Sequence, residues 1–238
     1  MKGILVLAGS GEFTPSMETP DKYILSRTKV RNVAILPTAA GKESDWHKWV
    51  EMGERHFRKL GVDAFGLNVL NASDANNPKK FVLLEKADFV YISGGDPGHL
   101  FHTLNKSLLW KNILEKFGQG MILAGSSAGA MAMGKYVLAN AQRLDKESSD
   151  WINGLGMVPF SIIPHYDYIK REEPQMLEKI NNETHNAIKK TFMGIDEDTA
   201  LMGESNSKAR VKGKGAVYLL DKNREYKSGS NTFLLLAT

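Results

Sequence analysis

The segment Met121-Ile122-Leu123-Ala124-Gly125-Ser126-Ser127-Ala128-Gly129 passes from an apolar run directly into a turn of glycines and serines. Four consecutive apolar residues without polar alternation predict a strand buried on both faces, as in a parallel sheet that helices cover. The small residues that follow predict a sharp turn into a helix. A buried strand that ends in such a turn is typical of α/β proteins, so this segment decides the fold class.

Similar apolar runs precede this segment and alternate with helical patterns. The runs cover residues 4–8, 33–36, 62–69 and 89–92. Between them, residues 44–60 carry large apolar side chains at spacings of about three and four, and helical material follows from 100 to 117. This alternation predicts a doubly wound α/β domain with a mostly parallel sheet.

The last third of the chain has a different pattern. A helix is expected over 174–190, followed by short strands at 200–202, 216–220 and 233–236. Turn residues at 221–223 and 228–229 indicate antiparallel hairpins. The alternating basic residues of 208–214 predict a solvated strand whose lysines oppose edge pairing. No linker, repeat or low-complexity tract interrupts the chain, so one domain is expected over residues 1–238.

Composition narrows the function classes. The 238 residues include no cysteine, which excludes disulfides, a thiolate nucleophile and cysteine-ligated metals. No apolar stretch approaches the roughly 20 residues of a spanning helix, and residues 1–9 fit a first strand better than a secretory signal, so a cytoplasmic protein without a membrane partner is expected. The net charge is +4, but the basic residues are interleaved with 27 acids, so nucleic-acid binding is not indicated.

Gly125-Ser126-Ser127-Ala128-Gly129 fits the G-x-S-x-G pattern of a nucleophilic serine on a strand-to-helix turn. Such a turn presents the Ser127 hydroxyl at the carboxyl edge of the sheet, and the amide of Ala128 can donate to a developing oxyanion. Gly94-Gly95 also follows an apolar strand, and its uncovered amides suit the other half of an oxyanion hole. Plain turns remain the alternative for both segments.

A serine hydroxyl needs a general base, and histidine is the usual one. His165 ends the short apolar run Ile162-Ile163-Pro164, which would mount it rigidly, and is our preferred base. His47 and His56 are expected to be solvated on an amphipathic helix, and His185 lies in a charged helix. His99 and His102 follow the glycine pair and remain alternatives.

The acid that orients the base is less determined. Residues 196–198, Asp-Glu-Asp, place three consecutive carboxylates between two apolar strands. Because like charges repel, one inward carboxylate with two solvated neighbours is expected there. Carboxylates near other expected strand ends stay open as candidates, namely Asp96, Asp145, Glu147 and Asp167.

Four motifs together carry a resemblance to a known family. Gly94-Gly95-Asp96, Gly125-Ser126-Ser127-Ala128-Gly129, Pro164-His165-Tyr166-Asp167 and Gly194-Ile195-Asp196-Glu197 occur in this order. In order and approximate spacing, nearly the whole chain resembles the serine peptidases that include aspartyl dipeptidase (peptidase E) and cyanophycinase. The resemblance implies a Ser-His-Glu triad on Ser127, His165 and Glu197, with oxyanion donors on the backbone of Gly95 and Ala128.

The resemblance also implies a flavodoxin-like fold similar to that of class I glutamine amidotransferases, a small peptide substrate, and neither metal nor cofactor. Pro97 stands where cyanophycinases carry a substrate-contacting glutamine, and fewer arginines follow the histidine, so cyanophycin is a poorer expectation than a short peptide. Arg171 is the candidate for holding an aspartyl carboxylate, and Asp96 is the second substrate-binding candidate. The oligomeric state stays open.

The sequence leaves three alternatives to a small serine peptidase. Gly9-Ser10-Gly11 after the first strand is similar to the phosphate loop of a nucleotide- or flavin-binding module, but Thr14 replaces the third glycine and Glu12 would repel a phosphate. A cyanophycinase-like hydrolase and a catalytically inactive binding protein are the remaining alternatives. Competent residues at all three triad positions give the inactive reading no support.

Overall fold

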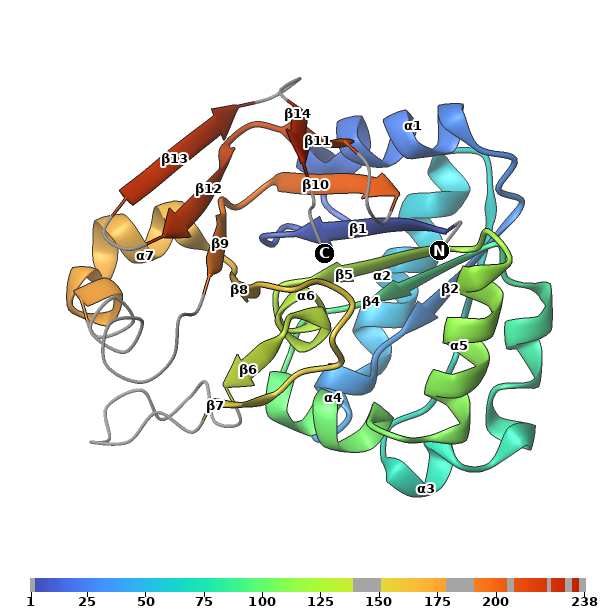
Figure 1. Ribbon diagram of the computed structural model, residues 1–238. Coiled ribbons are helices and arrows are strands. Elements are labelled where there is room, and N and C mark those ends of the chain that lie inside the picture. The colour runs from blue at the N-terminus through green and yellow to red at the C-terminus, as the bar shows by residue number, and fades with distance from the viewer. Residues whose placement is uncertain are drawn as a thin grey trace.

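The computed structural model of the chain describes residues 3–138, 151–178, 191–204, 208–221, 224–229 and 233–235. Its centre is an eight-stranded sheet in the order β14-β11-β10-β1-β5-β4-β2-β3 (Figure 1). Five neighbouring strands of this sheet are parallel: β1 (Ile4–Ala8), β5 (Ile122–Ser126), β4 (Phe89–Ile92), β2 (Asn32–Leu36) and β3 (Asp63–Gly66). Three antiparallel strands extend it beyond β1: β10 (Thr199–Glu204), β11 (Lys208–Gly213) and β14 (Phe233–Leu235).

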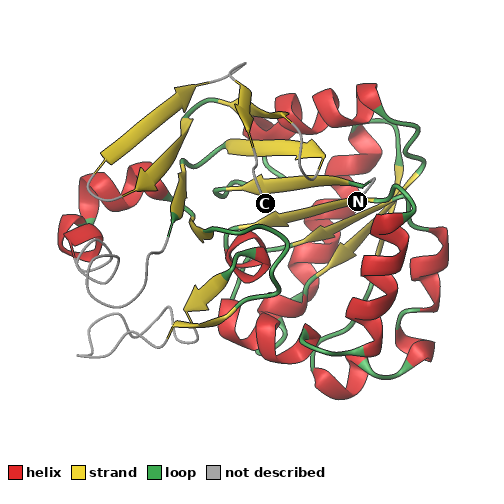
Figure 2. Cartoon of the chain, viewed as in Figure 1, coloured by secondary structure: helices red, strands yellow, loops and turns green. Residues whose placement is uncertain are grey.

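Helices cover both faces of the parallel strands (Figure 2). On one face lie α1 (Glu18–Arg27) and α2 (His47–Lys59), whose Ile24 and Phe57 pack against the sheet. On the other face lie α3 (Ala72–Ala75), α4 (Pro97–Leu104), α5 (Leu108–Gly118) and α6 (Ala128–Met133). A sheet covered in this way buries both sides of each strand, which explains the apolar runs without alternation.

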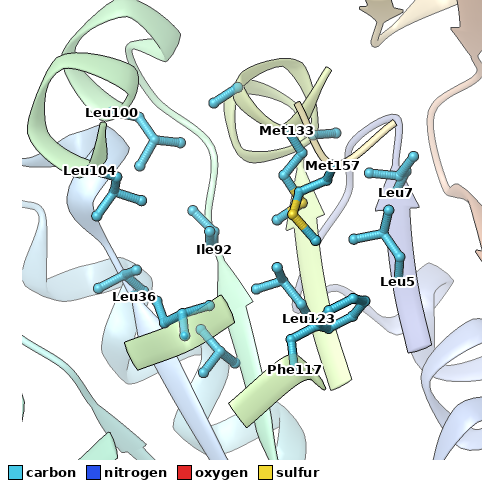
Figure 3. Close-up of a cluster of buried hydrophobic side chains, with 14 of the residues drawn as sticks. Leu5, Leu7, Leu36, Ile92, Leu100, Leu104, Phe117, Leu123, Met133 and Met157 are labelled. Atoms are coloured by element: carbon cyan, nitrogen blue, oxygen red, sulfur yellow. The ribbon is translucent and has the colours of Figure 1, made fainter. Parts of the chain in front are cut away.

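Figure 3 shows the core on the face of α4, α5 and α6. Leu5, Leu36 and Leu123 project from three parallel strands toward Leu104 of α4 and Phe117 of α5, and all five are buried. Burying a side chain of this size stabilises the fold by roughly 1.5–3 kcal/mol. This packing fixes the strands, and with them the residues that follow their carboxyl ends.

A second, four-stranded sheet lies beside the first, in the order β13-β12-β9-β8. Its strands are β8 (Ser161–Ile163), β9 (Phe192–Ile195), β12 (Ala216–Asp221) and β13 (Arg224–Gly229), and α7 (Tyr166–Glu172) follows β8. A short hairpin of β6 (Tyr136–Leu138) and β7 (Trp151–Asn153) completes the described elements. The mostly parallel doubly wound sheet with antiparallel strands at the C-terminal end confirms the expected fold class.

Two expected elements differ in detail, and a third is described only in part. The strand expected over 62–69 ends at Gly66, and the helix expected over 100–117 is divided into α4 and α5. The division occurs because Lys106 adopts φ 60° and the hydroxyl of Ser107 accepts a hydrogen bond from the amide of Trp110, which starts a new helix. The helix expected over 174–190 is present over 174–178, and the rest of that range lies outside the described residues.

Two expectations about the late strands were wrong. The basic strand β11 is not an edge strand, because β10 and β14 pair with it on either side. Residues 228–229 do not form a turn but continue β13, where they pair with Val217 and Ala216. β11 is covered by the later strand β14, and residues 228–229 pair with the preceding strand β12, so both outcomes depend on strand pairing and not on local pattern. Among the described helices, none combines the length and the apolar character that crossing a bilayer requires.

The expectation that His56 is solvated was also wrong. His56 of α2 is buried, and its Nε2 lies 2.7 Å from Asp21 Oδ2 of α1, which is equally buried. Burial raises the pKa of the Asp21 carboxyl, although the hydrogen bond with His56 opposes that shift. The pair links the two helices that cover one face of the sheet.

His56→Leu is expected to lower the free energy of unfolding by about 3–5 kcal/mol, because it leaves Asp21 buried without this partner. Urea unfolding followed by circular dichroism measures the change. The double variant Asp21→Leu/His56→Leu should recover much of the loss, since no uncompensated buried carboxyl remains. A loss below about 1 kcal/mol in the single variant would show that the pair contributes little to stability.

Candidate active site

Ser127 forms the turn between β5 and α6. Its backbone has φ 48° and ψ −113°, a region that a non-glycine residue rarely adopts. The turn is tight because a Cβ added at Gly125 would come within 2.5 Å of the Gly129 carbonyl carbon. The two glycines of the motif therefore permit a conformation that brings the Ser127 hydroxyl to the carboxyl edge of the sheet.

His165 follows β8 and begins α7, and it too has a left-handed backbone, with φ 50° and ψ 36°. Its Nε2 lies 3.0 Å from Ser127 Oγ. Two strained residues in direct contact at the ends of two strands are typical of a functional site, where surrounding structure maintains conformations that cost about 1–3 kcal/mol each.

Glu197 lies in the turn between β9 and β10. Its Oε1 is 2.7 Å from His165 Nδ1, and both side chains remain about two-fifths exposed, at 41% and 37%. The amide of Glu197 donates to Asp167 Oδ1 over 2.9 Å, so the first turn of α7 holds the Glu197 backbone in place. Ser127, His165 and Glu197 form a continuous hydrogen-bonded series.

The three consecutive carboxylates have three different environments. The inward one is Asp196, which is buried and accepts hydrogen bonds from the Ala216 amide and the Tyr218 hydroxyl. Burial raises the pKa of Asp196, while the Ala216 amide opposes that shift. Asp198 instead pairs with Lys214 at 2.9 Å. The inward carboxylate is thus a structural one, and the carboxylate at His165 is its half-exposed neighbour.

Gly94 and Gly95 lie beyond the end of β4. Gly95 has φ 138°, and a Cβ there would come within 2.5 Å of the Ala39 backbone, so only glycine fits. Among the described residues, the amides of Gly95 and Ala128 have no hydrogen-bond acceptor. Both residues line the pocket at Ser127. Two unpaired amides beside a serine hydroxyl that contacts a histidine are an arrangement able to stabilise an oxyanion.

Glu12 was expected only to repel a phosphate, but it contacts the residues directly before Gly95 and Ser127. It is 5% exposed, its Oε1 accepts from the Gly94 amide at 2.8 Å, and its Oε2 accepts from Ser126 Oγ at 2.7 Å. The sequence carried one signal for this contact. A carboxylate just after the first strand of a parallel sheet lies at the edge where the carboxyl ends of the parallel strands meet.

A cavity of about 180 Å³ opens at Ser127 and His165. Apart from Ser127, His165 and the glycine at 95, the described residues of its walls are apolar: Pro97, Ala128, Met131, Leu138, Trp151, Ile162, Ile163, Pro164, Ile169 and Met176. Most of them come from helices α4, α6 and α7 and strands β6, β7 and β8, and Met176 lies beyond α7. The hydroxyl of Ser127 is therefore reached through a predominantly apolar pocket.

The remaining candidates have other partners. Asp96 caps α4, since its carboxylate accepts from the His99 amide and pairs with Lys42. Burial works to raise the pKa of Asp96, but these two contacts hold it below its ordinary value. His99 Nε2 lies 2.7 Å from the Leu70 carbonyl oxygen, and His99 is not among the described residues that line the pocket.

Arg171 is exposed, and its Nε donates to Glu172 at 2.6 Å, a bond that raises the pKa of the guanidinium. It is not among the described residues that line the pocket. His47 and His102 are exposed. Asp145, Glu147 and His185 lie outside the described residues.

Comparisons with known proteins identify the family and the fold. A model of peptidase family S51 matches residues 4–211. The solved structure of a peptidase from an acI-B1 Actinobacterium superposes with a TM-score of 0.84 at 30% identity, covering 99% of this chain and 97% of that one. Peptidase E from Nostoc sp. is 26% identical over 222 residues, which cover 88% of this chain and 85% of the relative.

The cyanophycinase of Synechococcus elongatus is 26% identical over 197 residues, or 79% of this chain. The match covers 58% of that enzyme, so this chain corresponds to little more than half of its length. The family match spans all four motifs and the five parallel strands, which confirms the resemblance inferred from the sequence. This chain belongs to peptidase family S51.

Proposed function

We propose that the protein is a serine peptidase that hydrolyses short peptides through an acyl-enzyme. The observation that carries the proposal is the hydrogen-bonded series from Ser127 Oγ through His165 to Glu197. Nucleophile, base and orienting acid within hydrogen-bond distance are the requirements of this chemistry. The pocket at Ser127 and the family membership support the same function.

In the proposed reaction, His165 Nε2 accepts the proton of Ser127 Oγ as that oxygen attacks the carbonyl carbon of the scissile peptide bond. The amides of Gly95 and Ala128 donate to the resulting oxyanion, and Glu197 stabilises the imidazolium. His165 then gives its proton to the leaving amine, and the C–N bond breaks. Water, deprotonated by the same imidazole, hydrolyses the ester and restores the hydroxyl of Ser127.

A fluorophosphonate probe tests the proposal, because it reacts with activated serine hydroxyls. We expect a single labelled peptide with the modification on Ser127, and little labelling of the His165→Ala variant. A chain that binds nucleotides or acts as an inactive binding protein would remain unlabelled. Labelling at another serine would move the nucleophile elsewhere and overturn the assignment.

Arg171→Ala is expected to change kcat/KM for the dipeptide Asp-Leu by less than about fivefold, since an exposed ion pair contributes only about 0–1 kcal/mol. The steady-state rate is compared with that of a neutral ester, which reports on the triad alone. If Arg171 held an aspartyl carboxylate, the loss on Asp-Leu alone would instead be about 2 kcal/mol or more. A selective loss of that size would assign Arg171 to substrate binding.

A further inference from the structure

We propose that the pocket at Ser127 binds an apolar side chain of the acyl residue, so that the enzyme prefers peptides with leucine, methionine or phenylalanine before the scissile bond. This inference rests on the proposed function and adds its substrate class. It differs from the preference for an N-terminal aspartate that the family resemblance suggests.

The wall of the pocket is apolar over several elements. Met131 comes from α6, Leu138 from β6, Trp151 from β7, Ile163 from β8, and Ile169 from α7, with Met176 beyond it. Four of these side chains are buried even in the free protein, namely Met131, Leu138, Ile163 and Ile169. A pocket that is already formed takes an apolar group without first ordering its walls.

The size of the pocket fits a medium-sized side chain. Its volume of about 180 Å³ corresponds to roughly six water-sized groups at about 30 Å³ each. Leucine, methionine and phenylalanine fill most of that space, whereas alanine leaves it largely empty. Gly95 and Ala128, whose amides are free for the oxyanion, line the same pocket, so the side chain next to the acyl carbonyl is the one that reaches it.

Electrostatics oppose an acidic side chain here. None of the described residues that line the pocket is lysine or arginine. Two carboxylates also lie around His165. Glu197 Oε1 contacts His165 Nδ1, and Asp167 Oδ1 accepts from the Glu197 amide. Within the described lining, an aspartate side chain would therefore lose its hydration without gaining a cation, which is among the most expensive transfers in a protein.

The test uses aminoacyl coumarylamides that share one leaving group and differ in the acyl residue: leucine, phenylalanine, alanine, aspartate and arginine. We expect kcat/KM for leucine and phenylalanine to exceed that for alanine by about 10- to 100-fold, the rate equivalent of burying such a side chain. Aspartate is expected to be the poorest or to show no turnover. Aspartate above leucine would overturn the inference.

Pocket variants give an independent reading. Met176→Arg, at the partly buried wall, is expected to lower the leucine-to-aspartate ratio of kcat/KM at least tenfold, and Met176→Leu should preserve it. Leu114→Arg is the matched control, because Leu114 is 38% exposed on α5 and does not line the pocket. An unchanged ratio in Met176→Arg, with normal circular dichroism, would contradict the placement of the side chain.

Protection against the fluorophosphonate probe keeps this inference separate from the proposed function. Leu-Leu should slow labelling of Ser127 at concentrations where Asp-Leu does not, even if neither peptide is cleaved quickly. Equal protection by both peptides, or stronger protection by Asp-Leu, would overturn the apolar preference. A wild-type protein that is never labelled would overturn the proposed function itself.

A separate observation concerns Glu12, and we infer that it is a positioning residue for the oxyanion hole. One carboxylate oxygen accepts from the Gly94 amide, and the other accepts from Ser126 Oγ. These contacts join the loop after β1 to the residues directly before Gly95 and Ser127. They span 82 and 114 residues of sequence.

The positioning matters because both neighbouring turns have unusual backbone conformations. Ser127 has φ 48°, which is costly for a non-glycine residue, and Gly95 has φ 138°, which the free chain of a glycine would leave easily. The carboxylate accepts from the Gly94 amide, which fixes the peptide plane between Ser93 and Gly94. This plane is one unit before the Gly95 amide, so fixing it limits how far that amide can turn. Misdirecting one oxyanion donor costs up to about 10²–10³ in kcat.

Glu12→Ala is expected to lower kcat about 100-fold with less than a threefold change in KM, and to weaken binding of a peptide boronic acid by a similar factor. Glu12→Gln should retain about a tenth to a third of the wild-type kcat, because its amide oxygen can still accept from Gly94 while its amide nitrogen cannot accept from Ser126. Asp21→Asn, at another buried carboxylate, controls for a loss of stability alone and should leave kcat within threefold.

A merely structural Glu12 would lower the thermal midpoint of Glu12→Ala and leave kcat and boronate affinity unchanged well below that midpoint. That result would overturn the positioning role. If Glu12→Ala did not fold, the kcat of Glu12→Gln would decide: a loss confined to KM, or none, contradicts the inference, and a selective loss of kcat and boronate affinity supports it.

Discussion

Ser127→Ala is expected to lower kcat by about 10⁶-fold and to leave the fold intact. The serine hydroxyl is the proposed nucleophile, and its one described hydrogen bond, to His165 Nε2, is a contact between two side chains that does not support the core. Residual hydrolysis would come only from the oxyanion donors and from binding. The measurement is steady-state turnover of the best coumarylamide substrate, with circular dichroism to verify the fold.

Ser126→Ala is the matched control, since it removes a hydroxyl one position earlier in the same turn. This variant should still be labelled by the fluorophosphonate probe, whereas Ser127→Ala should not. The two serines of the motif are thereby separated. Activity of Ser127→Ala above a few per cent of wild type, with an unchanged dichroism spectrum, would place the nucleophile elsewhere.

Glu197→Gln is expected to lower kcat by about 10³- to 10⁴-fold. The glutamine amide can donate to His165 Nδ1, which would stabilise the tautomer that carries its proton on Nε2. That tautomer cannot accept the proton of Ser127, and the imidazolium also loses its anionic partner. Steady-state kinetics on the same substrate measures the loss, and KM should change little because Glu197 does not line the pocket.

The flanking carboxylates are controls for this prediction. Asp198→Asn should reduce kcat less than about tenfold, because its contact with Lys214 is an exposed ion pair. Asp196→Asn should act on the thermal midpoint instead, since Asp196 is buried against β12. Greater loss of kcat in either of these variants than in Glu197→Gln would reassign the acid of the triad.

Much of the fold could be predicted locally. Buried parallel strands produce apolar runs such as 89–92 and 122–124, and α2 produces spacings of about three and four, because each pattern reflects which face of an element is buried. The late strands were harder to predict. Whether β11 lies at an edge, and whether 228–229 turns or continues, depends on which strands pair with these residues, and no local pattern records that pairing.

In the candidate site, too, some residues could be predicted from local sequence and others could not. Ser127 and the glycine pair at 94–95 carry local signals, since sharp turns after buried strands require small residues. His165 could be selected from six histidines because a proline-fixed strand end precedes it. For the acid, the residues alone left several carboxylates open, and the family resemblance was needed to prefer Glu197. A carboxylate's partner depends on the path of the backbone through the turn, which three adjacent acidic residues cannot specify.

The sequence by itself determined the fold class, the order of the motifs and the nucleophile turn, because these follow from burial and steric limits within a few residues. Only the tertiary structure decided that Asp196 turns into the core, that His56 is buried against Asp21, and that Glu12 lies beneath Gly94. The apolar pocket beside Ser127 likewise combines α6, α7 and three strands. Such contacts depend on the order of strands in the sheet, which brings together residues that are far apart along the chain.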